Sequence, residues 1–458
     1  MLDRIKNCKI LVVGLARSGR AAIKLLANKG AREIVANDKK ELEEEELKLL
    51  HKTGTNIELV TGSNSPDLVT RDLSMIVKSP GVPPDLDIFK KAYSMGIPVI
   101  PEIELAYYFI KSPIIGITGT NGKTTTTMLT ATLFQEGGWN RSIAAGNIGL
   151  PLCEIAEEVT AGDIVLAELS SFQLEHLEKF RPWVAVILNL TEDHLDYHGT
   201  MDNYLLAKSK ILENQSFSDM VVLNYDDTRV KTLKNKACGR VLFFSKEKMV
   251  PGFCVSGETV GLYWNKQFIE VCPLEELSLK GEHNLENVLA ASASAWAGGV
   301  DLESISKVLR SFPGVEHRME KVREIDGVIF INDSKGTNPQ AAIKAMQAFP
   351  QKKVLIAGGK EKGGDFKEFA SQIKKEVKYL ILLGETAPRI AEAVKKIGYS
   401  SFAQVTSIEE AVRLAWSKAD SKEIVLLSPA CASWDMFNDF EERGWLFKKI
   451  VMTLKENG

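Results

Sequence analysis

Residues 114–124 read Ile-Ile-Gly-Ile-Thr-Gly-Thr-Asn-Gly-Lys-Thr, and a helical stretch follows over residues 125–135. An apolar run, a glycine-rich loop and a helix, in that order, predict a β-strand that leads into a phosphate-binding loop. Glycines let backbone N–H groups approach phosphate oxygens, and a helix N-terminus favours negative charge. Lys123 is then placed to reach the β- and γ-phosphates of a nucleotide, and Thr124 to ligate Mg²⁺. The loop departs from the usual pattern because Ile117 stands where the first glycine is expected.

The same alternation of apolar runs, polar or glycine-rich loops and helical stretches continues along the whole chain. This pattern is typical of parallel sheets covered by helices, so the predicted fold class is α/β with mainly parallel sheets. A chain of 458 residues is too long for one core. Because the pattern restarts at three places, we expect three domains, over residues 1–110, 111–313 and 314–458. A charge run at residues 41–46 is expected on a solvated helix face.

The composition narrows the class of protein. With 45% hydrophobic and 26% charged residues the chain is an ordinary globular protein, and a net charge of -3 leaves no basic excess for binding nucleic acid. The six cysteines are scattered without a CxxC pair, which argues against a disulfide framework or a structural zinc site. There is no signal-peptide pattern and no apolar run of membrane-spanning length. We therefore expect a cytoplasmic protein with reduced thiols that does not insert into a membrane.

Two more apolar runs lead into acidic or histidine side chains. Glu168 follows the run at residues 164–167, and Asp193 and His194 follow the run at residues 184–190. Ligands of parallel sheets bind beyond the carboxyl ends of the strands, so Glu168 is a candidate Mg²⁺ ligand and His194 a candidate for magnesium or phosphate chemistry. The alternatives are a surface acid for Glu168 and a hydrogen-bonded structural histidine for His194.

Zinc is the other metal to consider here. His194 and His198 are four residues apart, as in a zinc-binding helix, but Gly199 is a poor helix residue and no third soft ligand is nearby. The sequence favours magnesium.

Lys208 occupies an unusual position. The stretch at residues 201–214 predicts a helix whose core-facing stripe contains Tyr204, Ala207 and Ile211, and Lys208 falls into that stripe. Either its ammonium group has a special role, or its stem packs while the charge reaches water.

The first segment resembles a dinucleotide-binding unit. Gly14 and Gly19 follow a strand-like run, but Ala16 stands at the second glycine of a GxGxxG pattern, and Asp38 lies about where a ribose-binding acid is found. Taken alone, this segment leaves NAD binding open.

Several motifs recur together in an order known from one enzyme family. They are Gly119–Thr124, Glu168-Leu-Ser-Ser-Phe-Gln173, Thr191-Glu-Asp-His194, His283-Asn284 with Asn287, His317-Arg318, Asn332-Asp-Ser-Lys335 and Ser428-Pro-Ala-Cys-Ala-Ser433. Over essentially its whole length the chain resembles the Mur ligases. The second, sixth and seventh motifs are similar to those of the branch that adds D-glutamate.

The resemblance implies an ATP-dependent amide-bond ligase that joins D-glutamate to UDP-N-acetylmuramoyl-L-alanine through an acyl-phosphate, in peptidoglycan precursor synthesis. It implies Rossmann-like N- and C-terminal domains, for the UDP substrate and D-glutamate, on either side of a P-loop ATPase domain. ATP and Mg²⁺ are the expected co-substrate and cofactor, and we expect a monomer.

The resemblance also implies the residues of each site. The ATP group is Gly119, Thr120, Asn121, Gly122, Lys123, Thr124, Asn284, Asn287, Arg318 and Asp333. The UDP-substrate group is Leu15, Ala16, Asp38, Ser79, Asn147 and His194. The D-glutamate group is Lys335, Thr337, Lys362, Ser433 and Phe440. The metal group is Thr124, Glu168, His194 and Lys208, with Lys208 carbamylated, and the catalytic group is Lys123, Glu168, His194 and Lys208.

Two other functions stay open at this point. One is a different Mur ligase or a folylpolyglutamate-type ligase, which differs in the amino acid that stimulates phosphate release. The other is an ATP-dependent switch with a dinucleotide-binding domain, which would not need a UDP-muramoyl substrate.

Overall fold

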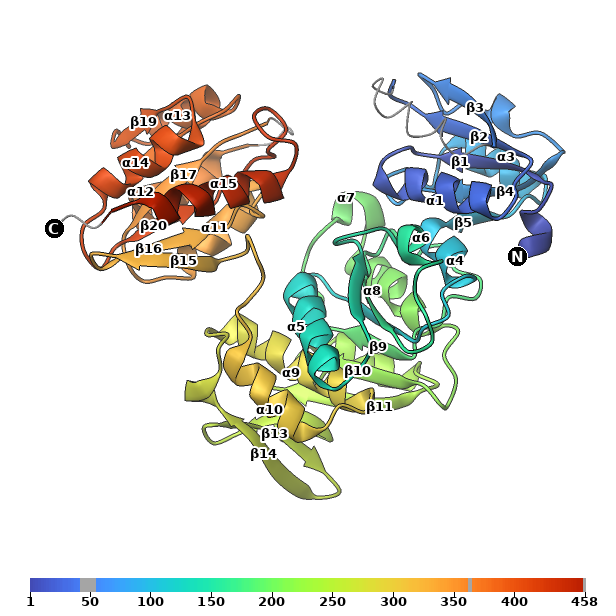
Figure 1. The fold of residues 1–458 in the computed structure, drawn as a ribbon, viewed down its shortest axis with the longest axis horizontal. Helices are drawn as coiled ribbons and strands as arrows, with labels where there is room; N and C mark the ends of the chain where they lie inside the picture. Colours follow the sequence, from blue (N-terminus) through green and yellow to red (C-terminus); the bar gives the residue numbers. More distant parts are fainter. Residues whose placement is uncertain (42–54, 361–364, 456–458) are drawn as a thin grey trace. The chain divides into compact units, whose positions relative to one another are not determined.

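The computed structural model describes residues 1–41, 55–360 and 365–455. The chain divides into two compact units, Met1–Pro313 and Gly314–Gly458, and each is considered by itself. Figure 1 shows the chain coloured along the sequence, with the first unit from blue to yellow and the second from orange to red. Most of the charge run at residues 41–46 falls outside the described residues.

The first sheet of the first unit contains, among the described residues, five strands in the order β3-β2-β1-β4-β5, and every neighbouring pair is parallel. Its strands are β1 (Lys9–Val13), β2 (Glu33–Asp38), β3 (Asn56–Thr61), β4 (Leu73–Lys78) and β5 (Val99–Pro101). Its helices are α1 (Arg17–Asn28), α3 (Asp87–Ser94) and α4 (Glu102–Tyr107).

The second sheet of this unit has nine strands within the described part of the chain, in the order β14-β13-β12-β11-β10-β9-β6-β8-β7. Only β13 pairs in the antiparallel sense, with β12 and β14. The strands are β6 (Ile114–Thr118), β7 (Ser142–Gly146), β8 (Ile164–Glu168), β9 (Val184–Ile187), β10 (Met220–Asn224), β11 (Arg240–Ser245), β12 (Gly252–Ser256), β13 (Thr259–Trp264) and β14 (Gln267–Pro273). The helices are α5 (Lys123–Glu136), α6 (Leu152–Ile155), α7 (Leu195–His198), α8 (Met201–Ser209), α9 (Glu282–Ala297) and α10 (Leu302–Ser311).

The second unit is built on one sheet, for which the described residues supply six strands in the order β15-β16-β20-β17-β18-β19. Its first pair, β15 with β16, is antiparallel and the others are parallel. The strands are β15 (Glu320–Ile325), β16 (Val328–Asn332), β17 (Lys353–Ala357), β18 (Val377–Leu382), β19 (Phe402–Gln404) and β20 (Ile424–Leu427). The helices are α11 (Pro339–Gln347), α12 (Lys367–Glu376), α13 (Ala387–Lys396), α14 (Ile408–Lys418) and α15 (Phe440–Thr453).

The central strands are buried on both faces. All residues of β6, β8, β9, β17 and β20 are buried, which is why these strands read as continuous apolar runs rather than alternating ones. The predicted fold class, α/β with mainly parallel sheets, is confirmed. Within the described ranges, no helix has both the length and the apolar character needed to cross a membrane.

The helix predicted over residues 201–214 is shorter than expected. The Thr200 side chain caps its start by accepting a hydrogen bond from Asn203 N–H, and α8 ends at Ser209, where a 3₁₀ turn over Lys210–Leu212 continues the chain. The tighter turn still leaves Ile211 facing inward, so the predicted core-facing stripe forms despite the early end.

The strand order determines which loops meet. In the central sheet β9, β6, β8 and β7 are consecutive neighbours and parallel, so the loops that follow them lie at one edge. These loops begin at Gly119 after β6, Leu169 after β8, Leu188 after β9 and Asn147 after β7.

Candidate active site

The phosphate-loop residues form a loop that is fastened to the neighbouring strand end. Gly119 and Gly122 have φ values of 155° and 82°, which side chains disfavour. The backbone N–H groups of Thr120 and Asn121 donate to Asn189, to its carbonyl oxygen at 3.0 Å and to Oδ1 at 2.8 Å. The loop after β9 therefore sets the shape of the loop after β6.

Asn284 and Asn287 lie on one face of α9, as their spacing predicts, and Asn287 Nδ2 donates to Asn284 Oδ1 at 3.4 Å. Asn287 packs directly against the phosphate loop: a Cβ at Gly122 would lie 2.1 Å from its Oδ1. Thr126 Oγ1 donates to the same oxygen at 3.3 Å. Gly122 is therefore required both for its backbone conformation and for this close approach.

Two lysine ammonium groups converge on the loop. Lys123 Nζ donates to the carbonyl oxygens of Gly119 at 2.9 Å and Thr120 at 2.8 Å. Lys208 Nζ, from α8, donates to the same Gly119 oxygen at 2.9 Å. Because both groups share one acceptor, like charges lie close together at the point where the sequence predicts nucleotide phosphates.

Lys208 is buried, with 1% of its surface exposed, beside the buried side chains of Tyr204 and Ile211. Its ammonium lies 4.5 Å from the centre of the Tyr204 ring. Burial, together with the charge of Lys123, lowers the pKa of Lys208 to about 7 from 10.5. The interpretation in which the charge of this lysine reaches water is wrong.

Glu168 ends β8 and is also buried. Its Oε1 accepts a hydrogen bond from Asn147 Nδ2 at 2.8 Å, whereas Oε2 is buried and has no hydrogen-bond partner among the described residues. A buried carboxylate oxygen without a partner is costly unless a ligand or ion satisfies it. Glu168 therefore fits a metal ligand better than a surface acid. Thr124, at the start of α5, is buried as well.

His194 is half-exposed and stands at the start of the single-turn helix α7 with a φ of 51°. Its ring lies 6.5 Å from that of Tyr204, which connects it to the Lys208 side of the site. His198 instead is buried and hydrogen-bonded to Ser171 Oγ at 2.9 Å. His198 is thus held by Ser171, and the choice between magnesium and zinc stays a prediction.

Protein ligands of the usual metal-binding types are scarce. Within the described ranges no group of three or more His, Cys, Asp and Glu side chains could hold a metal ion. The predicted ligands Glu168 and His194 would supply two such side chains, and Thr124 would add only a hydroxyl. A metal site here would need another oxygen donor.

A cavity of about 560 Å³ lies between the first two sheets, and it brings together four of the six predicted UDP-substrate residues: Ala16, Asp38, Ser79 and Asn147. The other two, Leu15 and His194, are not among the residues that line this cavity. Leu15 is buried, and its backbone N–H donates to Asp38 Oδ2 at 2.6 Å. Ser79 Oγ donates to the Gly14 carbonyl oxygen at 2.7 Å. This bond joins the loop after β4 to the loop after β1 at the edge of the cavity.

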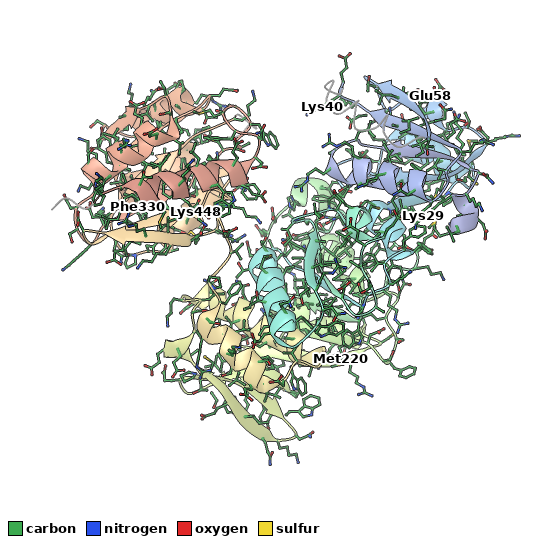
Figure 2. All side chains as sticks on the ribbon, in the orientation of Figure 1. Lys29, Lys40, Glu58, Met220, Phe330 and Lys448 are labelled. Carbon is green, nitrogen blue, oxygen red and sulfur yellow. The ribbon has the colours of Figure 1, made fainter. Side chains whose placement is uncertain are left out.

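Some residues that line this cavity were missed by sequence reasoning. Arg17 Nη2 donates to the Gly149 carbonyl oxygen at 2.7 Å and bridges the two walls of the cavity. Lys39 and Lys40 add cationic groups after β2, and Figure 2 labels Lys40. Arg17 stands inside the Gly14–Gly19 loop, so its position in that motif was the available signal.

In the second unit, Asp333 follows β16 and is buried. Burial raises its pKa to about 6, although the hydrogen bond from Ser428 Oγ at 2.7 Å and the positive charge of Arg318 oppose the rise. Arg318 is exposed. These two predicted ATP residues belong to the second unit and the other eight to the first, so one shared nucleotide site stays a prediction.

The predicted D-glutamate residues that the structure describes include three that lie beyond the carboxyl ends of two strands. Lys335 and Thr337 follow β16, and Ser433 follows β20, its neighbour in the sheet. Lys335 Nζ lies 5.5 Å from the centre of the Phe440 ring, at the start of α15. Lys362 falls outside the described residues.

Three family models match the chain in sequence order. They are Mur ligase MurD-like, N-terminal domain, over residues 8–101; Mur ligase middle domain, over residues 117–295; and Mur ligase, glutamate ligase domain, over residues 317–431.

The chain is also similar over its full length to curated proteins. A Pelotomaculum thermopropionicum protein named UDP-N-acetylmuramoylalanine--D-glutamate ligase is 48% identical and covers 100% of both chains. Proteins of the same name from Caldanaerobacter subterraneus and Clostridioides difficile are 46% and 44% identical, with 98% of this chain and 99% and 100% of theirs covered.

Solved structures share the fold at lower identity. The UDP-N-acetylmuramate-alanine ligase MurC from Thermotoga maritima matches with a TM-score of 0.60 and 21% identity, over 98% of this chain and 100% of that chain. The MurF ligase from Thermotoga maritima in complex with ADP matches with a TM-score of 0.55 and 18% identity, over 99% and 97%. By its sequence relatives and its fold, this chain belongs to the Mur ligase family, in the group named UDP-N-acetylmuramoylalanine--D-glutamate ligases.

Proposed function

We propose that this chain is an ATP-dependent ligase that adds D-glutamate to UDP-N-acetylmuramoyl-L-alanine in peptidoglycan precursor synthesis. The observation that carries the proposal is the 48% identity, over the whole of both chains, to a relative named for this reaction. We infer that residues 1–110 bind the UDP part of the substrate, residues 111–313 bind ATP, and residues 314–458 bind D-glutamate. A monomeric state and a cytoplasmic location stay predictions.

The reaction begins at the phosphate loop. The terminal L-alanine carboxylate of the substrate attacks the γ-phosphate of ATP, so that a carboxylate–phosphorus bond forms, the bond to the β-phosphate oxygen breaks and ADP leaves. Lys123 offsets the negative charge on the transferring phosphoryl group. Its ammonium now donates to two loop carbonyl oxygens, and phosphate oxygens would replace these acceptors.

The second step forms the amide. The D-glutamate amine attacks the acyl carbon of the acyl-phosphate, and the tetrahedral intermediate releases inorganic phosphate. Lys335, Thr337 and Ser433, with Lys362, hold the carboxylates of D-glutamate so that its amine faces the acyl carbon. Phe440 packs beside Lys335.

Mg²⁺, when bound, would neutralise phosphate charge and orient the β- and γ-phosphates. Thr124, Glu168 and His194 are the residues that would hold it. The unpartnered Oε2 of Glu168 supports this fit. Asn147 holds the other carboxylate oxygen and so orients Glu168 from the wall of the UDP-substrate cavity.

We infer that Lys208 is carbamylated. Carbamylation needs a neutral amine, and the lowered pKa of Lys208 leaves a large neutral fraction near neutral pH. The amine nitrogen adds to carbon dioxide and loses a proton, which replaces one of two converging cations by an anion. The new carboxylate supplies the oxygen donor that Glu168 and His194 lack.

The UDP moiety occupies the cavity between the first two sheets. Asp38 sits at its wall with one oxygen bound to Leu15 N–H, and Ser79 and Asn147 contribute polar groups. Ala16 lets the backbone approach the substrate at the start of α1, and its helix N-terminus favours the pyrophosphate charge.

A phosphate-release assay tests the proposal. The purified chain is incubated with ATP, Mg²⁺ and UDP-N-acetylmuramoyl-L-alanine, and single D- and L-amino acids are added in turn. Only D-glutamate is expected to stimulate release strongly. Stimulation by another amino acid would indicate a different ligase, and ATP hydrolysis independent of the UDP substrate would indicate a switch.

A further inference from the structure

Arg443 is the largest of the fully buried side chains of the second unit, with 2% of its surface exposed. It lies near the start of α15, the helix on which Figure 2 labels Lys448. The Asp439 side chain caps this helix by accepting a hydrogen bond from Glu442 N–H. Arg443 begins the buried stripe that continues through Phe447 and Ile450, so it points into the unit rather than into water.

The guanidinium group binds two separate loops. Nε donates to Ser334 Oγ at 2.9 Å, and Nη2 donates to the Ser334 carbonyl oxygen at 2.9 Å. On the other side, Nη1 lies 3.4 Å from the carbonyl oxygens of Cys431 and Ala432, and Nη2 lies 3.4 Å from that of Cys431. The fork of one side chain thus spans the gap between the loops that follow β16 and β20.

All these acceptors are neutral. Among the described residues no carboxylate forms an ion pair with Arg443, and Asp333 and Asp435 act on it only from a distance. Burial lowers the pKa of Arg443 to about 10, so the group stays charged at neutral pH. A buried cation without a direct ion-pair partner is expensive, and neutral packing would stabilise the unit better. Stability alone therefore does not account for an arginine here.

The two loops are those that carry the D-glutamate residues. Ser334 stands directly before Lys335, and Ala432 directly before Ser433. Apart from Arg443, the loops are joined by the hydrogen bonds from Ala430 N–H to the Gly336 carbonyl oxygen at 2.9 Å and from Ser428 Oγ to Asp333 Oδ2 at 2.7 Å. Arg443 is therefore placed to set the distance between Lys335 and Ser433.

We propose that Arg443 is a positioning residue for the incoming D-glutamate, because its guanidinium group bridges the Lys335 and Ser433 loops and fixes the spacing between them. The proposal rests on the proposed function. It adds that the spacing of the loops selects the length of the side-chain acid, so that D-glutamate is preferred over D-aspartate.

Lys353 offers a matched control in the same unit. It is also fully buried, at the start of β17, and its Nζ donates to the Phe349 carbonyl oxygen and to Glu376. The start of β17 is the amino end of the strand, opposite the edge that carries Lys335 and Ser433. Lys353→Met therefore removes a buried cation without touching the two loops.

The test measures steady-state kinetics of the full chain for all three substrates in Arg443→Lys, Ser334→Ala and Lys353→Met. Lysine keeps the charge but cannot bridge both loops, so Arg443→Lys is expected to raise the KM for D-glutamate about tenfold or more, with ATP and UDP-substrate KM values within about twofold of wild type. The preference for D-glutamate over D-aspartate in kcat/KM is expected to fall by about tenfold. Ser334→Ala, a milder change, is expected to shift the same two quantities in the same direction. Lys353→Met is expected to lower thermal stability and leave both unchanged.

The proposal is overturned if Arg443→Lys, or Ser334→Ala should the first variant not fold, keeps a wild-type KM for D-glutamate and a wild-type preference over D-aspartate. It is also overturned if all three KM values rise together, as a loosened unit would produce. Failure of the proposed function is a separate result, because wild-type protein would then show no D-glutamate-stimulated phosphate release.

Discussion

Replacing Lys208 by methionine is expected to stabilise the ligand-free protein at low pH while abolishing ligation. The folded pKa of about 7, compared with 10.5 for an ordinary lysine, corresponds to about 5 kcal/mol of unfavourable burial of the charged form. Methionine fills a similar volume without charge, but it loses the hydrogen bond to the Gly119 carbonyl oxygen, which is worth about 2 kcal/mol for a charged donor. The expected net gain is about 3 kcal/mol.

The pH dependence of this gain has a definite sign. Between about pH 7 and pH 10.5 the unfolded chain holds one more proton on Lys208 than the folded chain, so the free energy of unfolding of the wild type rises with pH in this range. Below about pH 7 both states are protonated and the full penalty applies. The advantage of Lys208→Met is therefore largest at pH 6 and disappears towards pH 10.

The assay is thermal unfolding of the full chain in buffers free of carbon dioxide, at pH 6 and at pH 9. A gain of about 3 kcal/mol predicts a rise in Tm of about 6 °C at pH 6 for a unit of this size. Lys9→Met is the matched control, because the ion pair with Glu33 at 2.8 Å raises the pKa of Lys9, and its loss should lower the Tm at pH 6.

Adding bicarbonate distinguishes the effect of the buried charge on stability from the effect of carbamylation. Carbon dioxide that adds only to the folded wild type should raise its Tm, whereas Lys208→Met should not respond. ¹³C-labelled bicarbonate should give a carbamate signal that is absent from Lys208→Met and Lys208→Arg. A Lys208→Met variant less stable than wild type at pH 6 would refute the burial argument, and equal responses of both proteins to bicarbonate would refute carbamylation.

Three further outcomes are expected. Lys123→Ala should lower turnover by about two orders of magnitude in a protein that still folds, because it removes a preorganised charge contact to the phosphates; wild-type turnover in a folded variant would remove Lys123 from the mechanism. Burial raises the pKa of Glu102 to about 7 from 4.5, so the protein loses stability as pH rises through this range. Glu102→Gln keeps an acceptor for Cys153 N–H and should be more stable by up to about 3 kcal/mol at pH 8 but not at pH 4, as urea unfolding at the two pH values would measure. Ser433→Ala should raise the KM for D-glutamate and leave UDP-substrate binding unchanged by calorimetry; a loss of nucleotide affinity alone would contradict the domain assignment.

The local sequence pattern was sufficient to predict features that depend on residues close together in the sequence. The phosphate loop could be predicted because a strand, glycines and a helix start are consecutive in the sequence. Lys208 could be singled out because helical spacing places it with Tyr204 and Ile211, and burial then follows from geometry. The closeness of Lys123 to Lys208 could not be predicted. Both ammonium groups donate to the Gly119 carbonyl oxygen, and this depends on how α8 packs against the central sheet.

Contacts between distant segments could not be predicted from residue spacing alone, although the family resemblance grouped Asp38 with Asn147. The cavity between the first two sheets joins Asp38 to Asn147, and no spacing in the chain indicates that these residues face each other. The same is true of Arg17, whose bond to Gly149 crosses that cavity. Arg443 did carry a sequence signal, since it stands four residues before Phe447 in an apolar stripe, which is the signal that identified Lys208.

Lys208 and Arg443 show two ways of keeping a cation buried beside a proposed anion-binding site. Both lie at the carboxyl edge of a sheet, and their described hydrogen-bond acceptors are neutral oxygens. Lysine can lose its proton, so Lys208 can become neutral and, as the proposed carbamate, anionic, which suits the proposed role in holding Mg²⁺. Arginine stays charged and keeps its fork of N–H donors, so Arg443 can bridge the two loops at any neutral pH. Exchanging the two residue types should therefore impair both sites to different degrees: Lys208→Arg cannot form the carbamate and should be inactive, whereas Arg443→Lys cannot bridge the two loops and should raise the KM for D-glutamate.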